Sequence, residues 1–488
     1  MFKNLSLVSG IAVILMVMSC ERNINIPVDA SLTSETEQTN QVEQGPFVTM
    51  EKALNTADLF MGSNGAVPNT RSTVTESPGP STVHTMEKDG KPMMYVVNYD
   101  KGGFAIISAT RDYMPILAYS EDGYFDVSSI QGGLSLWVDE TMTAVEASGE
   151  QADSVKTAMN RLWRVYEEDD AKSAISAIPT RSTSSTGYDA YIERCEELMN
   201  EYWDDGWNFT SLDNARYVFE DAGFLDVYEQ LCYSAEFNNS DPGHSIVGWK
   251  MGSSTESYGP MLQTQWHQDA PFNNLCGGYS AGCGAIAVAQ VMKYHEYPQQ
   301  ITYNGYPFTW SSIPNNPSSS SDQSKLIKAI GVTTNMRYWS VGSWTTPDEL
   351  EEGIEAFGYT VTRQNNNNNS VEREILRNHR PVIMLGNNTN LSILPGSAEY
   401  IGNSHYWVAD GARRTESNVF MVFAEWQPND CGEFTQSYYS IDDPLIISGT
   451  SSLFYYYNWG WGGVDDGWYA FNSNHYPYSR QNFLISKP

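Results

Sequence analysis

The sequence predicts a mixed α+β protein with more than one folding unit, and three observations support this. The chain has 488 residues, which is too long for one compact core. Short apolar runs separated by Gly-containing turns at 91–127 are typical of β-hairpins. Helical spacing follows at 134–166, and 285–292 is apolar on nearly every side, as in a buried helix.

Composition and charge restrict the class of protein. Hydrophobic residues make up 41% and aromatic residues 13%, which is typical of a globular chain and not of a disordered one. The net charge is −31 with only 28 Lys and Arg residues. Because phosphate binding needs a basic face, we expect no nucleic-acid partner.

The first twenty residues have the pattern of an export signal. One Lys is followed by an apolar run over 5–18 and then by Ser19 and Cys20, a run too short to span a bilayer stably. The end resembles the lipobox of bacterial lipoproteins, which implies lipidation of Cys20. The alternative is an ordinary signal peptide with an incidental Cys. We therefore expect an exported lipoprotein of the bacterial cell envelope, at the outer membrane or cell surface, held by an N-terminal lipid anchor or released after maturation.

Composition changes along the chain predict five segments. They are the signal (1–20), a polar, aperiodic tether (21–45), a small α+β unit (46–178), a linker or insertion of unknown role (179–257), and a motif-bearing domain (258–488).

A nucleophile candidate lies where the buried helix begins. The chain has six cysteines, and if Cys20 carries lipid an odd number remains, so at least one thiol stays free. Cys283 stands between Gly282 and Gly284, directly before the apolar run. A helix N-terminus lowers a thiol pKa from its usual ~8.5, and thiolate is the attacking species. The alternative is an inert core Cys.

His405 is the candidate proton-transfer partner. It begins HYWVADG, whose alternating side chains indicate a strand, and it follows a Gly-containing loop, where catalytic groups are common. His295 lies more than three turns along the same predicted helix and cannot reach Cys283. A histidine satisfied at a strand edge is the alternative.

Three more side chains are candidates for supporting roles. The Gln268 amide, in a loop before Cys283, can donate to an oxyanion together with a backbone N–H. Asn458 or the indole of Trp459 can hold the imidazole of His405 in position. The alternatives are an ordinary surface Gln and a hairpin with core aromatics.

These motifs together resemble the streptopain family of bacterial papain-like cysteine peptidases. The matching pieces are WHQDAPFNN, GCGAIAVAQVMKYHEYP, SHYWVADGA and NWGWGGVDDGWY, and residues 46 to about 130 resemble the family's inhibitory pro-domain. The resemblance implies a small α+β pro-domain ahead of a papain-like, two-lobed peptidase domain with a helical lobe and a twisted antiparallel sheet. It also implies Cys283 as nucleophile, His405 as general acid and base, and Gln268 in the oxyanion hole, with Trp459 beside the histidine.

Two features depart from the family pattern. Gly284 stands where the family usually has a larger apolar residue, and residues 180–250 match nothing in it. The pro-domain boundary is therefore open, and cleavage sites near Arg181 and Lys250 are both candidates.

The expected function is a secreted zymogen of a cysteine endopeptidase that cleaves protein or peptide substrates through a thioester. No metal or other cofactor is expected, because the sequence has no HExxH or paired-Cys ligand spacing. One alternative is an inactive surface lipoprotein that binds glycans or proteins through its 30 Tyr and 14 Trp. Another is a transglutaminase-like acyl transferase on the same fold. The sequence predicts neither the natural substrate nor the oligomeric state.

Overall fold

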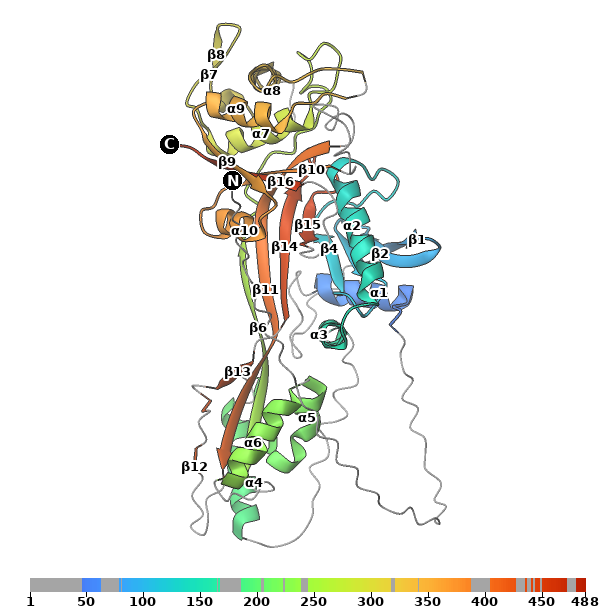
Figure 1. The fold of residues 1–488 in the computed structure, drawn as a ribbon, viewed down its shortest axis with the longest axis vertical. Coiled ribbons are helices and arrows are strands. Elements are labelled where there is room, and N and C mark those ends of the chain that lie inside the picture. The colour runs from blue at the N-terminus through green and yellow to red at the C-terminus, as the bar shows by residue number, and fades with distance from the viewer. Residues whose placement is uncertain are drawn as a thin grey trace, which may run out of the picture. The chain divides into compact units, whose positions relative to one another are not determined.

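The computed structural model describes most of the chain after residue 45 (Figure 1). The predicted signal, tether and lipidation site Cys20 lie outside the described residues. Within the described part, no helix combines the length and apolarity needed to cross a membrane. The described residues are 46–62, 79, 81–164, 166, 186–202, 206–222, 224–237, 245–316, 321–340, 342–387, 404–426, 435–436, 440–441, 444–447, 450–471 and 480–488.

One large antiparallel sheet joins the N-terminal unit to the C-terminal domain, and β7 and β8 form a separate small sheet. Strand β4 pairs with β15 through Tyr119 opposite Trp468, so the two predicted α+β units share one sheet. The expectation of an α+β fold is confirmed. The main strands in spatial order are β1 (Ser81–Lys88), β2 (Lys91–Tyr99), β3 (Phe104–Ser108), β4 (Ile116–Ser120), β15 (Gly467–Ala470), β14 (Thr450–Asn458), β11 (Ser404–Trp426), β10 (Val382–Asn387), β16 (Arg480–Ser486) and β9 (Thr360–Asn365).

The described residues of the N-terminal unit contain the predicted hairpins and the helices α1, α2 and α3. The helical region predicted over 134–166 is two helices, α2 (Gly132–Ser148) and α3 (Asp153–Arg164), because α2 ends at the C-cap Gly149. Helix α1 (Met50–Gly62) packs on β2 and β3, and α2 contacts β2, β10 and β11. Thus α2 links the N-terminal unit to strands of the C-terminal domain.

The helical lobe of the C-terminal domain surrounds helix α7 (Cys283–His295). Every residue from Gly284 to Met292 is buried, which confirms the central helix predicted from its apolar character. Helix α7 packs against β11 and α8 (Ser321–Thr333), and α8 contacts α9 (Pro347–Ala356) and β7 (Ile301–Tyr303), which pairs with β8 (Tyr306–Phe308). Helix α10 (Asn368–Leu376) connects β9 to β10. Helix α7 thereby places its N-terminus at the sheet.

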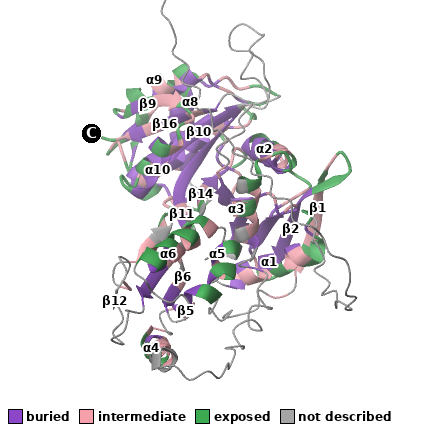
Figure 2. Ribbon diagram, turned by 60° about the horizontal axis from the view of Figure 1, so that its bottom comes forward, coloured by how far each residue is buried: buried purple, intermediate pink, exposed green. Residues whose placement is uncertain are grey.

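The segment without a family match forms a helix-covered extension of the sheet. Strand β6 (Ile246–Tyr258) pairs along β11 from Ala412 to Glu425, and β5 (Asn208–Ser211) pairs with β6. Short strands β12 (Thr435–Gln436) and β13 (Leu445–Ile447) also pair with β11. Helices α4 (Thr186–Tyr202), α5 (Arg216–Ala222) and α6 (Leu225–Phe237) accompany these strands, with exposed residues on their outer faces (Figure 2). The described residues between 186 and 258 therefore form helices and strands that extend the sheet.

Candidate active site

The thiol of Cys283 is positioned by a turn that requires glycine. Cys283 is the first residue of α7, as the sequence predicts, and the N-cap Gly282 has φ +91°. This φ is rare for residues with a side chain, and a Cβ at Gly282 would lie 2.7 Å from the sulfur of Met336. The backbone N–H of Tyr406 donates to Cys283 Sγ at 3.5 Å. This contact brings the start of α7 to the start of β11.

In this conformation the Cys283 thiol is neutral. Burial raises its pKa above the ordinary value, and the backbone N–H groups of Tyr406, Gly284 and Cys283 itself lower the pKa by less. The helix-tip effect expected from the sequence is therefore outweighed here, because the partly buried Cys283 has no imidazolium hydrogen-bonded to its sulfur to offset desolvation.

The imidazole of His405 faces Trp459 and not the thiol. Its Nε2 lies 2.9 Å from the carbonyl oxygen of Trp459, and its ring centroid is 5.1 Å from that of Trp461. Only 4% of His405 is exposed, and burial lowers its pKa to about 4, although the Trp459 carbonyl raises the pKa slightly. The ring is therefore neutral, with a proton on Nε2 that it donates to Trp459. Among the described residues, no hydrogen bond joins this ring to Cys283.

The backbone nevertheless places the two groups as neighbours. Tyr406, whose N–H contacts the thiol, directly follows His405 on β11. Successive side chains of a strand point to opposite faces, so the His405 side chain leaves the chain one residue from the sulfur contact. The structure brings both predicted residues to the start of β11, and within the described residues each is hydrogen-bonded to a partner other than the other one.

The first turn of α2 covers the His405 ring. A Cβ built on Gly132 would lie 3.1 Å from ring atoms Cγ and Nδ1, and one built on Gly133 would lie 3.0 Å from Cδ2. The same Cβ on Gly133 would be 2.7 Å from the Trp459 ring. Only glycine allows so close an approach. The N-terminal unit thus holds the imidazole in its resting orientation.

Gln268 lies in the loop that enters α7. Its Oε1 accepts a hydrogen bond from the Ser280 hydroxyl at 2.9 Å, and its carbonyl accepts from the Ala281 N–H at 2.9 Å. The first bond fixes the side-chain carboxamide and the second fixes the backbone of Gln268, both to residues just before Cys283. They engage oxygen atoms and leave the side-chain N–H₂ as the group that can donate to an oxyanion.

The side chain of Asn458 forms hydrogen bonds that connect its strand to α7. Its amide donates to the Thr264 carbonyl, and its Oδ1 accepts from Gln290 Nε2 on α7, both at 2.9 Å. It makes no hydrogen bond to His405 among the described residues. Trp459, by contrast, contacts the histidine through its backbone carbonyl, while its indole N–H donates to the Asp465 carbonyl at 3.0 Å. The sequence does not predict this contact, because every residue has a backbone carbonyl.

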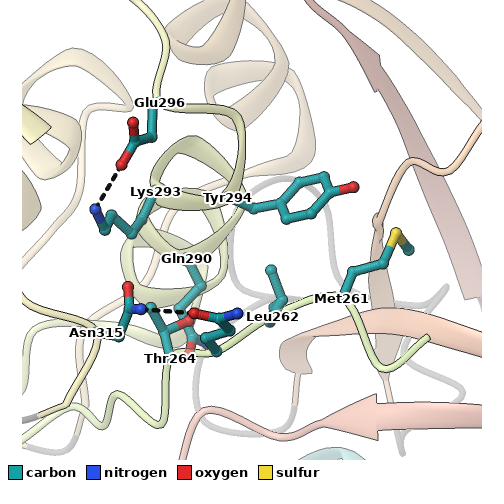
Figure 3. Close-up of a pocket in the computed structure, with 9 residues that line it drawn as sticks. Met261, Leu262, Thr264, Gln290, Lys293, Tyr294, Glu296 and Asn315 are labelled. Atoms are coloured by element: carbon teal, nitrogen blue, oxygen red, sulfur yellow. Dashed lines mark hydrogen bonds and ion pairs between the residues drawn. The ribbon is translucent and has the colours of Figure 1, made fainter.

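A pocket of about 250 Å³ lies along α7 away from these groups (Figure 3). Lys293 and Glu296 form an ion pair of 2.9 Å at one side, and Gln263 and Asn315 are bonded at the other. The remaining lining residues are Met261, Leu262, Thr264, Gln290 and Tyr294. Neither Cys283 nor His405 lines this pocket, so it is separate from the candidate active site. No cluster of metal-ligating side chains occurs in the part of the chain that was described.

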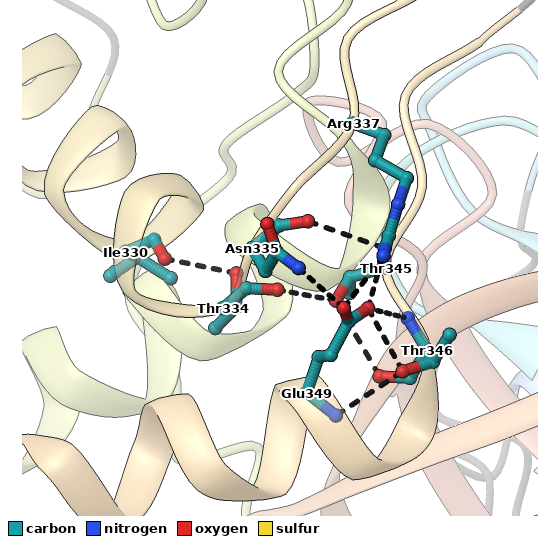
Figure 4. Close-up of polar contacts among 7 residues, drawn as sticks. All are labelled: Ile330, Thr334, Asn335, Arg337, Thr345, Thr346 and Glu349. Atoms are coloured by element: carbon teal, nitrogen blue, oxygen red, sulfur yellow. Dashed lines mark hydrogen bonds and ion pairs between the residues drawn. The ribbon is translucent and has the colours of Figure 1, made fainter.

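An ion-pair network braces the segment behind Cys283 (Figure 4). Arg337 donates twice to Glu349, at 2.5 and 2.7 Å, and Glu349 completes the capping box of Thr346 at the start of α9. Arg337 also pairs by its backbone with Trp344, next to Ser343, whose hydroxyl donates to the Ser280 carbonyl at 2.6 Å. The network therefore supports the strand-like segment that holds the entry to α7.

We expect Glu349→Gln to lower the free energy of unfolding by about 1–2 kcal/mol at pH 7, because it removes a bidentate charged bond and weakens a helix cap. Arg337 lowers the pKa of Glu349 from about 4.5 to about 2. A lowered carboxyl pKa stabilises the fold above pH 4.5, and this stabilisation is lost as pH falls toward 2. Thermal melts from pH 7 to 3.5 should show the two proteins converging, whereas exposed Glu355→Gln should match wild type throughout. Equal melting temperatures at pH 7 would contradict this.

Comparison with known proteins places these residues in a family. Residues 266–469 match the Peptidase C10 family, and residues 45–145 match the Spi protease inhibitor family. No curated protein gives a significant match. Similar solved structures include a fragment of prointerpain A from Prevotella intermedia, with 15% identity, a TM-score of 0.39, and coverage of 84% of this chain and 100% of that chain. Another is active interpain A from the same organism, with 20% identity, a TM-score of 0.30, and coverage of 47% and 94%. The chain is therefore a cysteine peptidase zymogen of the peptidase C10, or streptopain, family, with an inhibitor pro-domain before its peptidase domain.

Proposed function

We propose that Cys283 is the nucleophile of this peptidase, that His405 is its general acid and base, and that the described conformation is the latent precursor. The observation that supports this proposal is that the imidazole and the thiol each have a hydrogen-bond partner other than the other group. The imidazole bonds to the Trp459 carbonyl under Gly132 and Gly133, while the thiol accepts from the Tyr406 N–H. Neighbouring groups that are both neutral and turned apart are what an inactive cysteine peptidase requires. A glycan-binding protein or an acyl transferase is not favoured by the family match.

Departure of α2 would convert this site into a reactive one. With Gly132 and Gly133 gone, the His405 ring meets water and its pKa rises toward its ordinary value of 6.5. The ring can then turn to Cys283 and take the thiol proton. The positive end of α7 and the new imidazolium both stabilise the thiolate.

Peptide hydrolysis would then follow in two balanced steps. The thiolate attacks the carbonyl carbon, and the oxyanion is held by the Gln268 amide and the Cys283 N–H. The His405 imidazolium gives its proton to the leaving amine, which leaves a thioester. His405 next removes a proton from water, the hydroxide attacks the thioester, and the proton returns to the sulfur as the acid product departs.

Maturation would be carried out by the peptidase itself. Of the two candidate cleavage regions, Lys250 lies inside β6 opposite Met421, where the chain is paired and a peptidase cannot easily extend it. Arg181 lies outside the described residues. The region before α4 is therefore the better candidate.

The proposed location is the bacterial cell envelope, with export directed by residues 1–20 and anchoring through lipid on Cys20. Support comes from the sequence pattern, namely one Lys, an apolar run and a terminal Ser-Cys pair. In this location a latent precursor protects the exporting cell from its own peptidase.

We expect Cys283→Ala to accumulate as full-length precursor, because self-cleavage needs the thiolate. Wild type and the control Cys232→Ala, whose sulfur lies in the insertion, should both shorten to a common product. Gel mobility and terminal sequencing over time measure this. Normal processing of Cys283→Ala would mean that another peptidase performs the cut.

The Cys283 thiol should change its reactivity on maturation. In freshly purified precursor, iodoacetamide should label it slowly at pH 7 and rapidly only above the ordinary pKa of a thiol, since burial raises the pKa of Cys283. In the mature enzyme, labelling at pH 6 should be at least about tenfold faster. Mass spectrometry of the Cys283 peptide gives the rates, with the Cys232 peptide as an internal control. Equal rates in both forms would count against latency at this site.

A methyl group at Gly133 should weaken latency. Its Cβ would meet the rings of Trp459, Trp407 and His405 at 2.7–3.0 Å, so Gly133→Ala should push α2 away and speed maturation several-fold. The control is Gly149→Ala at the end of α2, where the nearest atom is 3.9 Å away. The time course of precursor loss compares them. A Gly133→Ala precursor as persistent as wild type would show that this contact does not hold the imidazole.

A further inference from the structure

Three residues on neighbouring strands form a row across the sheet. Gly386 of β10 lies directly opposite His405 of β11 on one side and opposite Arg480 of β16 on the other. Residues directly opposite in antiparallel strands project from the same face. With strands ~4.8 Å apart, the Cα atoms of His405 and Arg480 are roughly 10 Å apart. The proposed catalytic histidine and this arginine therefore share one face, separated only by a residue without a side chain.

Helix α2 covers this row with one stripe of residues. Gly133, Leu136 and Glu140 are three and four positions apart, so they lie on the same side of the helix. Gly133 packs on His405, as described above. A Cβ on Gly386 would be 2.6 Å from Leu136 Cδ1, and Glu140 forms an ion pair with Arg480. Each residue of the row is thus covered by one residue of α2, from Gly133 on His405 to Glu140 on Arg480.

The ion pair between Glu140 and Arg480 is buried and joins the two parts of the zymogen. The exposed fractions of the side chains are 4% for Arg480 and 2% for Glu140. Arg480 also lies 5.6 Å from the centroid of the Trp407 ring. Within the described residues, the second carboxylate oxygen of Glu140 has no hydrogen-bond partner. The carboxylate of this pair is supplied by the pro-domain, which leaves on maturation, while the guanidinium stays with the peptidase domain.

We propose that in the mature peptidase Arg480 binds a carboxylate of the substrate, on the side of the scissile bond that carries the leaving amine. This inference rests on the proposed function. Glu140 then occupies in the zymogen the place of that substrate carboxylate. Arg480 is a specificity-determining residue and takes no part in bond cleavage.

The position of this carboxylate along the substrate follows from the geometry. His405 must stand beside the leaving amine to protonate it, so the chain beyond that amine passes over the row. An extended chain advances ~3.3 Å per residue, and roughly 10 Å therefore corresponds to the second or third residue after the scissile bond. Gly386 allows the substrate backbone to lie close to the sheet at the intervening position. A planar guanidinium matches a carboxylate by two parallel hydrogen bonds, which favours Asp or Glu over Asn or Gln.

Matched peptides test the inference on wild-type enzyme matured from the full-length chain. Active sites are counted by titration with a thiol-directed epoxide. One set of fluorogenic peptides differs only by Glu or Gln at the second or third residue after the scissile bond. A further pair of peptides ends at that residue, with a C-terminal carboxylate in one and a C-terminal amide in the other. We expect kcat/KM about tenfold higher for Glu than for Gln at one of these positions, and the terminal pair shows whether a C-terminal carboxylate serves equally. No preference at any of these positions would overturn the inference without recourse to a variant.

The arginine itself is tested by substitution. In Arg480→Gln the Glu-to-Gln ratio should fall to about one, and Arg480→Lys should keep part of the ratio because it keeps the charge. The matched control is Arg363→Gln on β9, which pairs with Asp348 and Glu351 and lies outside the row. A full ratio in Arg480→Gln would overturn the inference. Absence of any peptide hydrolysis that depends on Cys283 would overturn the proposed function instead, together with what rests on it.

Discussion

The structure depends on the close packing of two glycines of α2 against one imidazole. Gly132 and Gly133 bring helix backbone against the His405 ring, and the Trp459 carbonyl holds the ring from its Nε2 side. Burial then acts on the two reactive groups in opposite directions, raising the pKa of the Cys283 thiol and lowering that of the imidazole to about 4. Both effects favour neutral forms. Latency therefore does not require a group that covers the sulfur of Cys283. Formation of the thiolate–imidazolium pair is already unfavourable.

The pro-domain is held by features that suit a removable part. In the described residues its sheet continues into the peptidase domain through the short pairing of β4 with β15, and the Glu140–Arg480 pair is buried between the two parts. Burying such a pair contributes little net stability, since desolvation offsets much of the attraction. It does penalise any other placement of α2, because a shifted helix would leave an unpaired charge in an apolar environment. The pair therefore fixes where α2 lies more than how tightly it binds.

Local sequence patterns were enough to predict the elements that carry the candidate pair. The Gly-Cys-Gly turn before an apolar run predicted the start of α7 at Cys283, and alternation after His405 predicted β11. Contacts between distant segments were beyond such patterns. The Asn458 carboxamide is hydrogen-bonded to Gln290 and Thr264, which are distant in sequence and come close only in the tertiary fold. The pairing of β6 with β11, and the shared sheet of two units expected to be separate, likewise depend on long-range register that no local periodicity encodes.

A helix can occupy a substrate's place without being a substrate. From Gly133 to Glu140 the helix rises 1.5 Å per residue, so these seven steps span roughly 10 Å, about the distance an extended peptide covers in three. The helix can therefore set a carboxylate on Arg480 and backbone on His405 at once. Its own peptide bonds stay closed in helical hydrogen bonds, out of reach of nucleophilic attack. One face of the sheet thereby serves inhibition in the precursor and, by the same contacts, recognition in the enzyme.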